Sequence, residues 1–229
     1  MTRHCQSGWC DTGTMAWTGS PAGGVSRKRL IHLGPPESGQ VTSVVRFAAG
    51  SRFAMHPHPG GEEILVLDGV FSDAQGDWPA GTYLLNPEGF VHAPWSETGC
   101  TLFVRLRQHP GPRRAIAMTT SGEAAWRGQV GGPQHLDLHR PADQPDATWL
   151  EDWPAGHVHT PTACPDGLEI FIVTGTLTSG GGTRPPGAWL NLAPGESFTG
   201  STADGCRLYM RRGGGVHLAA ASHVEPLTA

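Results

Sequence analysis

The stretch MHPHPGGEEILVLDG, Met55–Gly69, decides how the chain is interpreted. Two histidines one residue apart, His56 and His58, precede the paired glutamates Glu62 and Glu63, and an apolar run follows. Side chains of an extended strand alternate between two faces, so by parity Glu62 shares the face of the histidines and Glu63 takes the opposite face. Neutral imidazoles and a carboxylate together suit zinc, iron, nickel or manganese. The stretch is therefore either a metal site beside a strand or a His- and Gly-rich loop leading into one.

The composition around this stretch favours an all-β fold. The 229 residues include 33 Gly and 20 Pro, which separate short apolar runs, and no long helical pattern is present. Antiparallel strands joined by tight turns are expected over residues 41–48, 63–71, 81–86 and 100–107. Strands of this length predict a small sandwich or barrel.

The chain also contains an internal repeat. Residues 48–71 align without a gap with residues 154–177, so paired residues lie 106 positions apart. The pairs are Gly50 and Gly156, Glu63 and Glu169, Gly69 and Gly175, Pro79 and Pro185, Gly81 and Gly187, Gly89 and Gly195, and Gly99–Cys100 and Gly205–Cys206. Duplication of one domain explains this alignment better than chance.

We therefore expect two tandem domains after a flexible leader. The leader covers residues 1–26, the first domain residues 27–112 and the second domain residues 113–229, with a Pro- and Gly-rich linker near Gly111–Arg114. Trp17 is expected to pack onto a domain.

Two motifs in the first repeat carry the functional prediction. The pattern G-x5-H-x-H-x3-E-x6-G is filled by Gly50, His56, His58, Glu62 and Gly69. The pattern G-x5-P-x-G-x2-H is filled by Gly81, Pro87, Gly89 and His92. These motifs resemble those of the cupin superfamily, and the wider sequence is similar to the ChrR-like cupins, named for the metal-binding domain of an anti-sigma factor. One departure is Ser96, where an asparagine is often found.

The resemblance implies two tandem cupin barrels (a double-stranded β-helix, or jelly roll) across about residues 17–213. By position it implies the metal ligands His56, His58, Glu62 and His92, with Glu63 as the competing carboxylate. It implies one divalent transition metal ion: iron, zinc, nickel or manganese. A six-coordinate ion held by four protein ligands keeps two positions open, as catalytic sites do. No other catalytic residue is identified.

Three functions follow from this site. The first is a metal-dependent dioxygenase acting on a small organic substrate with a carbonyl group, as in ketone-cleaving relatives; Ile64, Val66, Tyr83 and Trp95 are candidate pocket residues. The second is a metal-dependent sensor or regulatory cupin related to the anti-sigma factor, although no helical zinc domain precedes the cupin motifs. The third is a scaffold with an incidental metal. The resemblance also implies a homodimer.

The second repeat has lost all four ligands. Thr162, Cys164, Leu168 and Phe198 occupy the positions of His56, His58, Glu62 and His92. An apolar interior avoids the cost of burying unpaired polar groups, so we expect a degenerate cupin. A shifted site formed by His157, His159 and Cys164 is the alternative.

Charge and cysteine content limit the remaining functions. The net charge of −4 gives no reason to expect a nucleic-acid partner. No apolar run is long enough for a membrane span, and the N-terminal segment lacks the apolar core of a secretory signal, so a cytoplasmic protein is expected. The five cysteines, Cys5, Cys10, Cys100, Cys164 and Cys206, are expected to be incidental free thiols, and His4 with Cys5 and Cys10 matches no zinc pattern.

Overall fold

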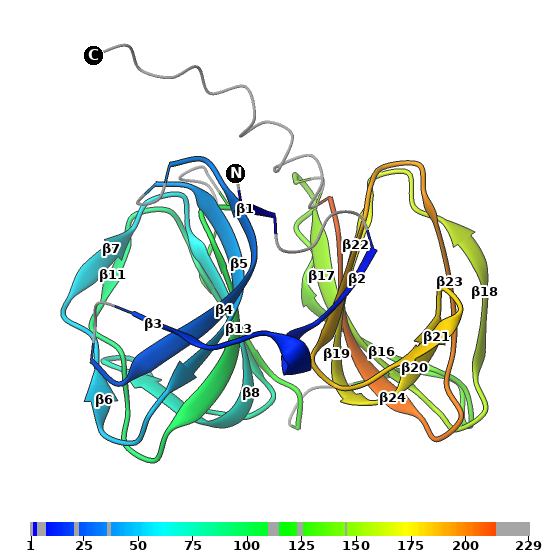
Figure 1. Cartoon of the computed structure of the whole chain (residues 1–229), viewed down its shortest axis with the longest axis horizontal. Helices are drawn as coiled ribbons and strands as arrows, with labels where there is room; N and C mark the ends of the chain where they lie inside the picture. Colours follow the sequence, from blue (N-terminus) through cyan, green and yellow to red (C-terminus); the bar gives the residue numbers. More distant parts are fainter. Residues whose placement is uncertain are drawn as a thin grey trace, which may run out of the picture.

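The structure is a computed structural model that describes residues 2–3, 8–20, 23–35, 38–109, 115–122, 126–144 and 146–213. The described chain consists of β-strands and one short 3-10 helix, η1 (Thr12–Thr14). The strands form two barrels that lie side by side (Figure 1). The all-β prediction and the prediction of two tandem cupin barrels are confirmed.

Most strands of the first barrel lie between residues 18 and 106. They are β3 (Thr18–Gly19), β4 (Val25–Leu33), β5 (Gln40–Phe47), β6 (Ser51–Arg52), β7 (His56–His58), β8 (Glu62–Asp73), β9 (Gly76–Pro79), β10 (Thr82–Asn86), β11 (Phe90–His92), β12 (Trp95–Ser96) and β13 (Cys100–Leu106), and β1 (Thr2–Arg3) pairs with β4. The four strands expected from the sequence correspond to β5, β8, β10 and β13.

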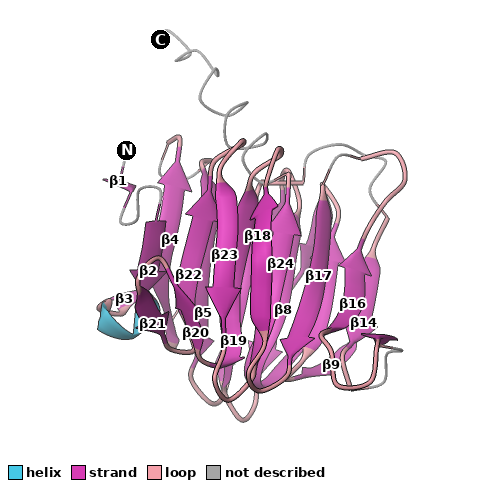
Figure 2. Cartoon of the chain, turned by 90° about the vertical axis from the view of Figure 1, so that its right-hand side faces the viewer, coloured by secondary structure: helices cyan, strands magenta, loops and turns pink. Residues whose placement is uncertain are grey.

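Most strands of the second barrel lie between residues 127 and 212. They are β15 (Arg127–Gly128), β16 (Gln134–His139), β17 (Ala147–Trp153), β18 (Val158–Ala163), β19 (Leu168–Gly175), β20 (Leu177–Ser179), β21 (Gly182–Arg184), β22 (Ala188–Leu192), β23 (Ser197–Ser201) and β24 (Cys206–Arg212). Seen from the side of this barrel, the strands stand next to one another with short loops between them (Figure 2).

The sheets of the two barrels have matching strand orders. The first main sheet runs β4-β5-β13-β8-β10-β14, where β14 is Ala117–Thr120. The second runs β16-β17-β24-β19-β22-β2, where β2 is Gly8–Asp11. In both, a glycine at the repeat position, Gly69 or Gly175, has a positive φ near 74° or 72°. A Cβ there would lie 2.1 Å from the carbonyl oxygen of Gly99 or Gly205, so only glycine fits the position. The repeated glycines therefore allow the close approach of β8 to β13 and of β19 to β24.

In each barrel, the strand at one edge of the main sheet comes from the segment of chain that precedes the other barrel in sequence. Strand β2 (Gly8–Asp11) pairs antiparallel with β22 of the second barrel, beside which it lies in Figure 1. Strand β14 (Ala117–Thr120) pairs antiparallel with β10 of the first barrel. We refer to this arrangement as the strand exchange.

The strand exchange corrects the prediction of a flexible leader. Residues 8–20 form β2, η1 and β3. Strand β2 pairs with β22 of the second barrel, and β3 pairs with β4 of the first barrel. The Trp17 ring packs beneath Lys28 and Arg46, whose charged ends lie 4.5 and 4.4 Å from its centroid. The linker Gly111–Arg114 and residues His4 and Cys5 lie outside the described residues, and the domain limits stay a prediction.

Three apolar cores hold the molecule together. One fills the first barrel around Phe47, Ile64 and Phe71, and one fills the second barrel around Ile170 and Phe198. The third lies between the barrels and takes residues from both; the Phe103 and Phe171 rings meet there at 4.6 Å between centroids. The barrels are therefore packed against each other and are not independent units joined by a tether.

Among the described cysteines, Cys100, Cys164 and Cys206 are free and buried, as expected. Cys10 is disulfide-bonded, so the prediction of an incidental free thiol is wrong at this position. Within the described ranges, no helix has the length and apolar character needed to cross a membrane.

Candidate metal centre

Pairing of the two short strands β7 and β11 brings the predicted histidines together. In this antiparallel pair His92 lies opposite His56, and Phe90 lies opposite His58. His58 and His92 are 7% and 5% exposed, while His56 is half-buried. The pairing thus brings the histidine of the second motif close to both histidines of the first, with ring centroids 5.1 Å from His56 and 4.8 Å from His58.

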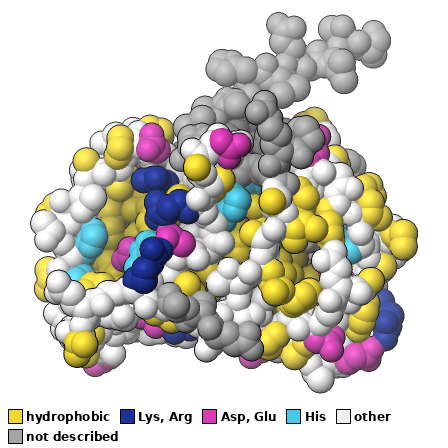
Figure 3. Space-filling view, turned by 180° about the vertical axis from the view of Figure 1, so that it is seen from behind, with side chains coloured by type: hydrophobic (Ala, Val, Ile, Leu, Met, Phe, Trp, Pro, Cys, Tyr) yellow, Lys and Arg dark blue, Asp and Glu magenta, His cyan; other side chains and the backbone are white. Residues whose placement is uncertain are grey.

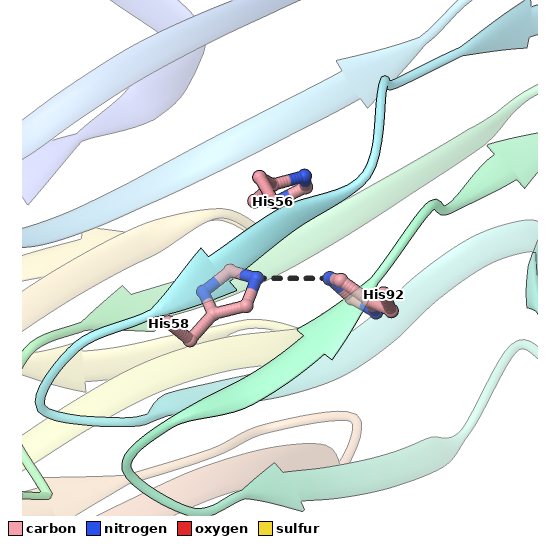
Figure 4. A group of neighbouring side chains, drawn as sticks. All are labelled: His56, His58 and His92. Carbon is pink, nitrogen blue, oxygen red and sulfur yellow. Dashed lines mark hydrogen bonds between the residues drawn. The ribbon is translucent and has the colours of Figure 1, made fainter.

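The three imidazoles point toward one another, as Figure 4 shows. One nitrogen from each of His56, His58 and His92 lies within 4.8 Å of the other two, and His58 Nε2 is 2.9 Å from His92 Nε2. With metal–nitrogen bonds of about 2.1 Å, neighbouring ligands of an octahedral ion would be about 3.0 Å apart. The spacing of this pair therefore suits two ligands of a single ion. Among the described residues, this is the only group of three or more metal-binding side chains whose ligand atoms converge in this way.

The carboxylate of Glu62 lies beside two of the histidines. Its Oε2 is 3.5 Å from His58 Nε2 and 3.6 Å from His92 Nε2, and the Asn86 amide donates a hydrogen bond to the same oxygen at 3.1 Å. Burial raises the pKa of Glu62, despite the opposing influence of His92 and Asn86. A carboxylate whose ionised form is disfavoured by burial gains most from a nearby cation. Glu62 therefore borders the cluster of His56, His58 and His92 but is not one of its members.

Glu63 points to the opposite side of β8, as its parity predicts. Ile64 and Val66, which share a face with Glu62, belong to the core inside the first barrel, whereas Leu65 belongs to the core between the barrels. Glu63 is 2% exposed and accepts hydrogen bonds from side chains of both barrels. The donors are Arg105 Nη1 at 3.1 Å, His109 Nε2 at 2.8 Å, Thr148 Oγ1 at 3.0 Å and Tyr209 Oη at 2.8 Å. Glu63 is therefore a structural group of the barrel interface.

The Glu63 position explains why this glutamate, and not Glu62, is repeated in the second domain. Its repeat partner Glu169 accepts from Arg105 Nη2 at 3.1 Å and from Trp189 Nε1 at 2.8 Å, also between the barrels. Arg211, the repeat partner of Arg105, donates to Asp146 at 3.1 Å. The repeated acidic and basic residues thus form one buried ionic network at the interface.

The sequence interpretation missed Asp73 and Asn86, which support the site from outside the ligand set. Asp73 Oδ2 lies 3.3 Å from His92 Nδ1, the nitrogen that faces away from the cluster. Such a contact fixes the tautomer and the ring orientation of a metal-binding histidine. Asp73 lies at the end of β8, and no motif spacing identifies it. Asn86 could have been found only from its position opposite Glu62 in the pairing of β8 with β10.

Among the three histidines, His58 has an imidazole that burial keeps neutral. Burial, together with the positive potential from His92, His56 and Arg107, lowers the pKa of His58 to about 3. Only the neutral ring has a free lone pair for a metal ion. His58 is therefore ready to coordinate at neutral pH without first losing a proton.

A cavity of about 360 Å³ opens onto the histidines and Glu62. Its apolar wall includes Phe53, Ile64, Phe71 and Leu102. Two other candidate pocket residues belong to apolar cores: Val66 to the core inside the first barrel and Tyr83 to the core between the barrels. Trp95 is half-buried, and the Arg52 guanidinium lies 5.4 Å from its ring centroid. The cavity has the size and mostly apolar lining of a small-molecule site.

The corresponding place in the second barrel keeps a cavity of about 260 Å³, lined by Thr162, Cys164, Leu168 and Phe198 in place of the four expected ligands. Thr162 lies opposite Phe198 in the β18–β23 pair, as His56 lies opposite His92 in the first barrel. Cys164, Leu168 and Phe198 all belong to the core of this barrel. The alternative site formed by His157, His159 and Cys164 is not present among the described residues. The centroids of the His157 and His159 rings are 6.5 Å apart, and both rings contact Trp153.

Together, the paired barrels and the three converging histidines define a cupin with a candidate metal centre in its first barrel. Residues 6–110 match the ChrR Cupin-like domain family. No curated protein matches the chain in sequence.

Solved structures with the same fold cover nearly the whole chain. A putative dioxygenase from Nostoc punctiforme has a TM-score of 0.75 at 16% identity, over 92% of this chain and 83% of its own. The bacterial pirin YhhW from Escherichia coli, in complex with nickel(II), has a TM-score of 0.66 at 15% identity, over 90% and 98%. A Bacillus subtilis oxalate decarboxylase mutant has a TM-score of 0.63 at 11% identity, over 91% and 77%. At these identities the likeness establishes the fold alone.

Proposed function

We propose that the first barrel is the active site of a metal-dependent oxygenase that acts on a small organic substrate containing a carbonyl group. His56, His58, Glu62 and His92 hold one divalent transition metal ion, and the 360 Å³ cavity receives the substrate. The ion supplies a Lewis acid and open coordination positions. The chain contributes a shaped, largely apolar cavity that limits access of water.

The convergence of three imidazole nitrogens at the base of this cavity is the observation that carries the proposal. A structural zinc site would be closed by protein ligands on all sides, whereas this group borders an open space. The fold neighbours described as a dioxygenase, a nickel-bound pirin and an oxalate decarboxylase are consistent with metal chemistry in such a barrel.

Elemental analysis of protein purified without added metal or chelator tests the proposal. We expect about one equivalent of iron, nickel or manganese per chain, lost in His92→Ala and retained in the control His159→Ala. Dioxygen consumption with β-diketones should then follow the metal content. Two equivalents, or one equivalent that survives His92→Ala, would contradict the ligand set.

A sensor or regulatory cupin is the second candidate, because residues 6–110 match the ChrR Cupin-like domain. In that case about one equivalent of zinc would be bound, no carbonyl compound would be turned over, and a sigma factor would co-purify with the protein. Turnover that disappears with the metal would exclude this candidate.

A further inference from the structure

We propose that the ligand of the first barrel is an organic acid whose carboxylate is bound by Arg27 and Arg29 at the cavity wall formed by β4. This inference rests on the proposed function, since it assigns a chemical class to the substrate of the same cavity. The same ligand would present its carbonyl oxygens to the metal centre.

Both arginines enter the cavity because they alternate along the inner face of β4. Val25, on the same face, belongs to the core inside the barrel, whereas Leu30 belongs to the core between the barrels. Lys28, on the outer face, donates to the Thr12 carbonyl at 2.6 Å. A bulge between Arg29 and Ile31 then changes the alternation, so the two arginines are the inward cations of this strand.

The polar lining of the cavity favours an anion. Among the described lining residues, Arg27, Arg29 and Arg107 face a single carboxylate, Glu62. A bound divalent cation would make the cavity more positive still. Clefts lined by one sign of charge attract ligands of the other sign, and guanidinium groups match the planar geometry of a carboxylate.

The position of each arginine suits ligand capture. Arg29 is exposed and lines the cavity, and it belongs to none of the ion pairs found among the described residues. Arg27 is half-buried, and its Nη2 donates to Ser20 Oγ at 2.5 Å, which orients the guanidinium. Arg107 is close enough to His58 to affect its pKa, and it is the only non-glycine residue of the described chain with a positive φ, 59°.

Arginines elsewhere on the molecule show a different environment. On the face in Figure 3, basic side chains lie next to acidic ones and histidines. On the second barrel Arg140 Nε is 2.7 Å from Asp137, and Arg207 Nε is 2.6 Å from Asp152. These surface pairs neutralise each other, whereas the lining of the first-barrel cavity includes three arginines and one carboxylate, that of Glu62.

The sheet order bounds the shape of the ligand. Strands β5 and β13 separate β4 from β8, which carries Glu62. Neighbouring strands are about 4.8 Å apart, so the two positions are separated by about 14 Å along the sheet and by less across the curved barrel. A ligand that joins the two positions would carry its carboxylate several carbon atoms from its metal-binding oxygens, as 4,6-dioxoheptanoate does.

Calorimetric titration of the nickel-loaded protein with 4,6-dioxoheptanoate and with its neutral methyl ester tests this inference. We expect the acid to bind about tenfold more tightly than the ester, as charge-assisted hydrogen bonds imply. Arg27→Gln/Arg29→Gln should abolish that advantage and leave the ester affinity within about twofold. Arg52→Gln, which removes an exposed arginine of the same barrel, is the matched control and should change neither affinity. Exposed Arg29 can be replaced alone, so an Arg29→Gln variant covers the case in which the double variant does not fold.

Equal binding of acid and ester, or an advantage that survives both arginine replacements, would overturn the inference while leaving the metal centre intact. If the protein binds none of iron, nickel and manganese, the proposed function fails, and the titration is made on the metal-free protein. An arginine-dependent preference for the acid would then support an anion site alone, and its absence would reject both proposals.

Discussion

Asp73 has a defined contact with the candidate metal centre, because its Oδ2 lies 3.3 Å from His92 Nδ1. Its other oxygen accepts from the Gln75 backbone at 2.9 Å and from Trp78 Nε1 at 3.3 Å, so the carboxylate is held on two sides. Hydrogen bonding to His92 lowers the pKa of Asp73 against the effect of burial, which keeps it ionised at neutral pH. The orientation of His92 therefore depends on a residue that is not itself a ligand.

Replacing this residue should weaken metal binding without removing any ligand. We expect Asp73→Asn to raise the dissociation constant for zinc(II) about 10–100-fold, because the amide holds the His92 ring less firmly and makes it less basic. Competition with a chelator of known affinity measures the effect. Asp77→Asn is the control, since Asp77 accepts from Ser72 Oγ at 2.6 Å and does not touch a histidine. Equal affinity in the two variants would mean that Asp73 does not orient His92.

His109 is the second residue with a measurable consequence, because it is fully buried between the barrels. Glu63 and Asp146 face its two nitrogens, and Arg105 and Arg211 lie in the same network. Burial, assisted by the charges of the two arginines, lowers the pKa of His109 to about 3, although Glu63 acts in the opposite direction. The folded protein thus holds a neutral imidazole where the unfolded chain would be protonated below about pH 6.5.

Stability should therefore fall with acid across this interval. From pH 6.5 down toward pH 3 the unfolded chain takes up a proton at His109 that the folded chain does not, so the free energy of unfolding should fall by up to about 1.4 kcal/mol per pH unit from this residue. Above pH 6.5 the contribution is complete. Urea unfolding of metal-free protein at pH 7.5 and pH 5.0 measures it, and His109→Gln should show a shallower decline than the unmodified protein. Identical declines would show that His109 is protonated in the folded state.

At the scale of the strands, local sequence predicts the elements whose pattern is decided locally. Strands β5, β8, β10 and β13 have apolar runs bounded by glycine and proline, and the motif spacing identifies the histidines that β7 and β11 bring together. Strand β4, VSRKRLIHL, was not expected, because its basic residues interrupt the alternation of apolar and polar residues that indicates a strand. Asp73 and Arg29 acquire their roles only when distant strands meet, so spacing rules alone do not identify them.

The strand exchange was also beyond prediction, since it pairs residues about 180 positions apart. It can be tested with proline, which removes a backbone donor from a ladder. We expect Trp9→Pro to reduce hydrogen-exchange protection in β22 of the second barrel, and Met118→Pro to reduce protection in β10 of the first barrel. Trp9→Ala controls for loss of the side chain and should leave β22 protected. The strand exchange would be contradicted if Trp9→Pro reduced protection only in the first barrel and Met118→Pro only in the second barrel.

At the scale of the whole molecule, the core between the barrels joins two units of different chemistry. The first barrel has three converging histidines, whereas Phe198 and Leu168 stand at two of the corresponding positions in the second barrel. The second barrel supplies Tyr209 and Thr148 to Glu63, the neighbour of Glu62 on β8. A barrel without ligands thus holds the outer face of the strand that carries the carboxylate of the other barrel.

The strand exchange also limits how such a chain can change during evolution. If the second copy were deleted, the first would lose β14 and expose the backbone of β10 as an open edge, a surface that favours aggregation. Point substitutions that erase the ligands of one copy carry no such penalty. A duplicated gene of this kind is therefore free to specialise one half for chemistry, but it is selected to retain the length of both halves.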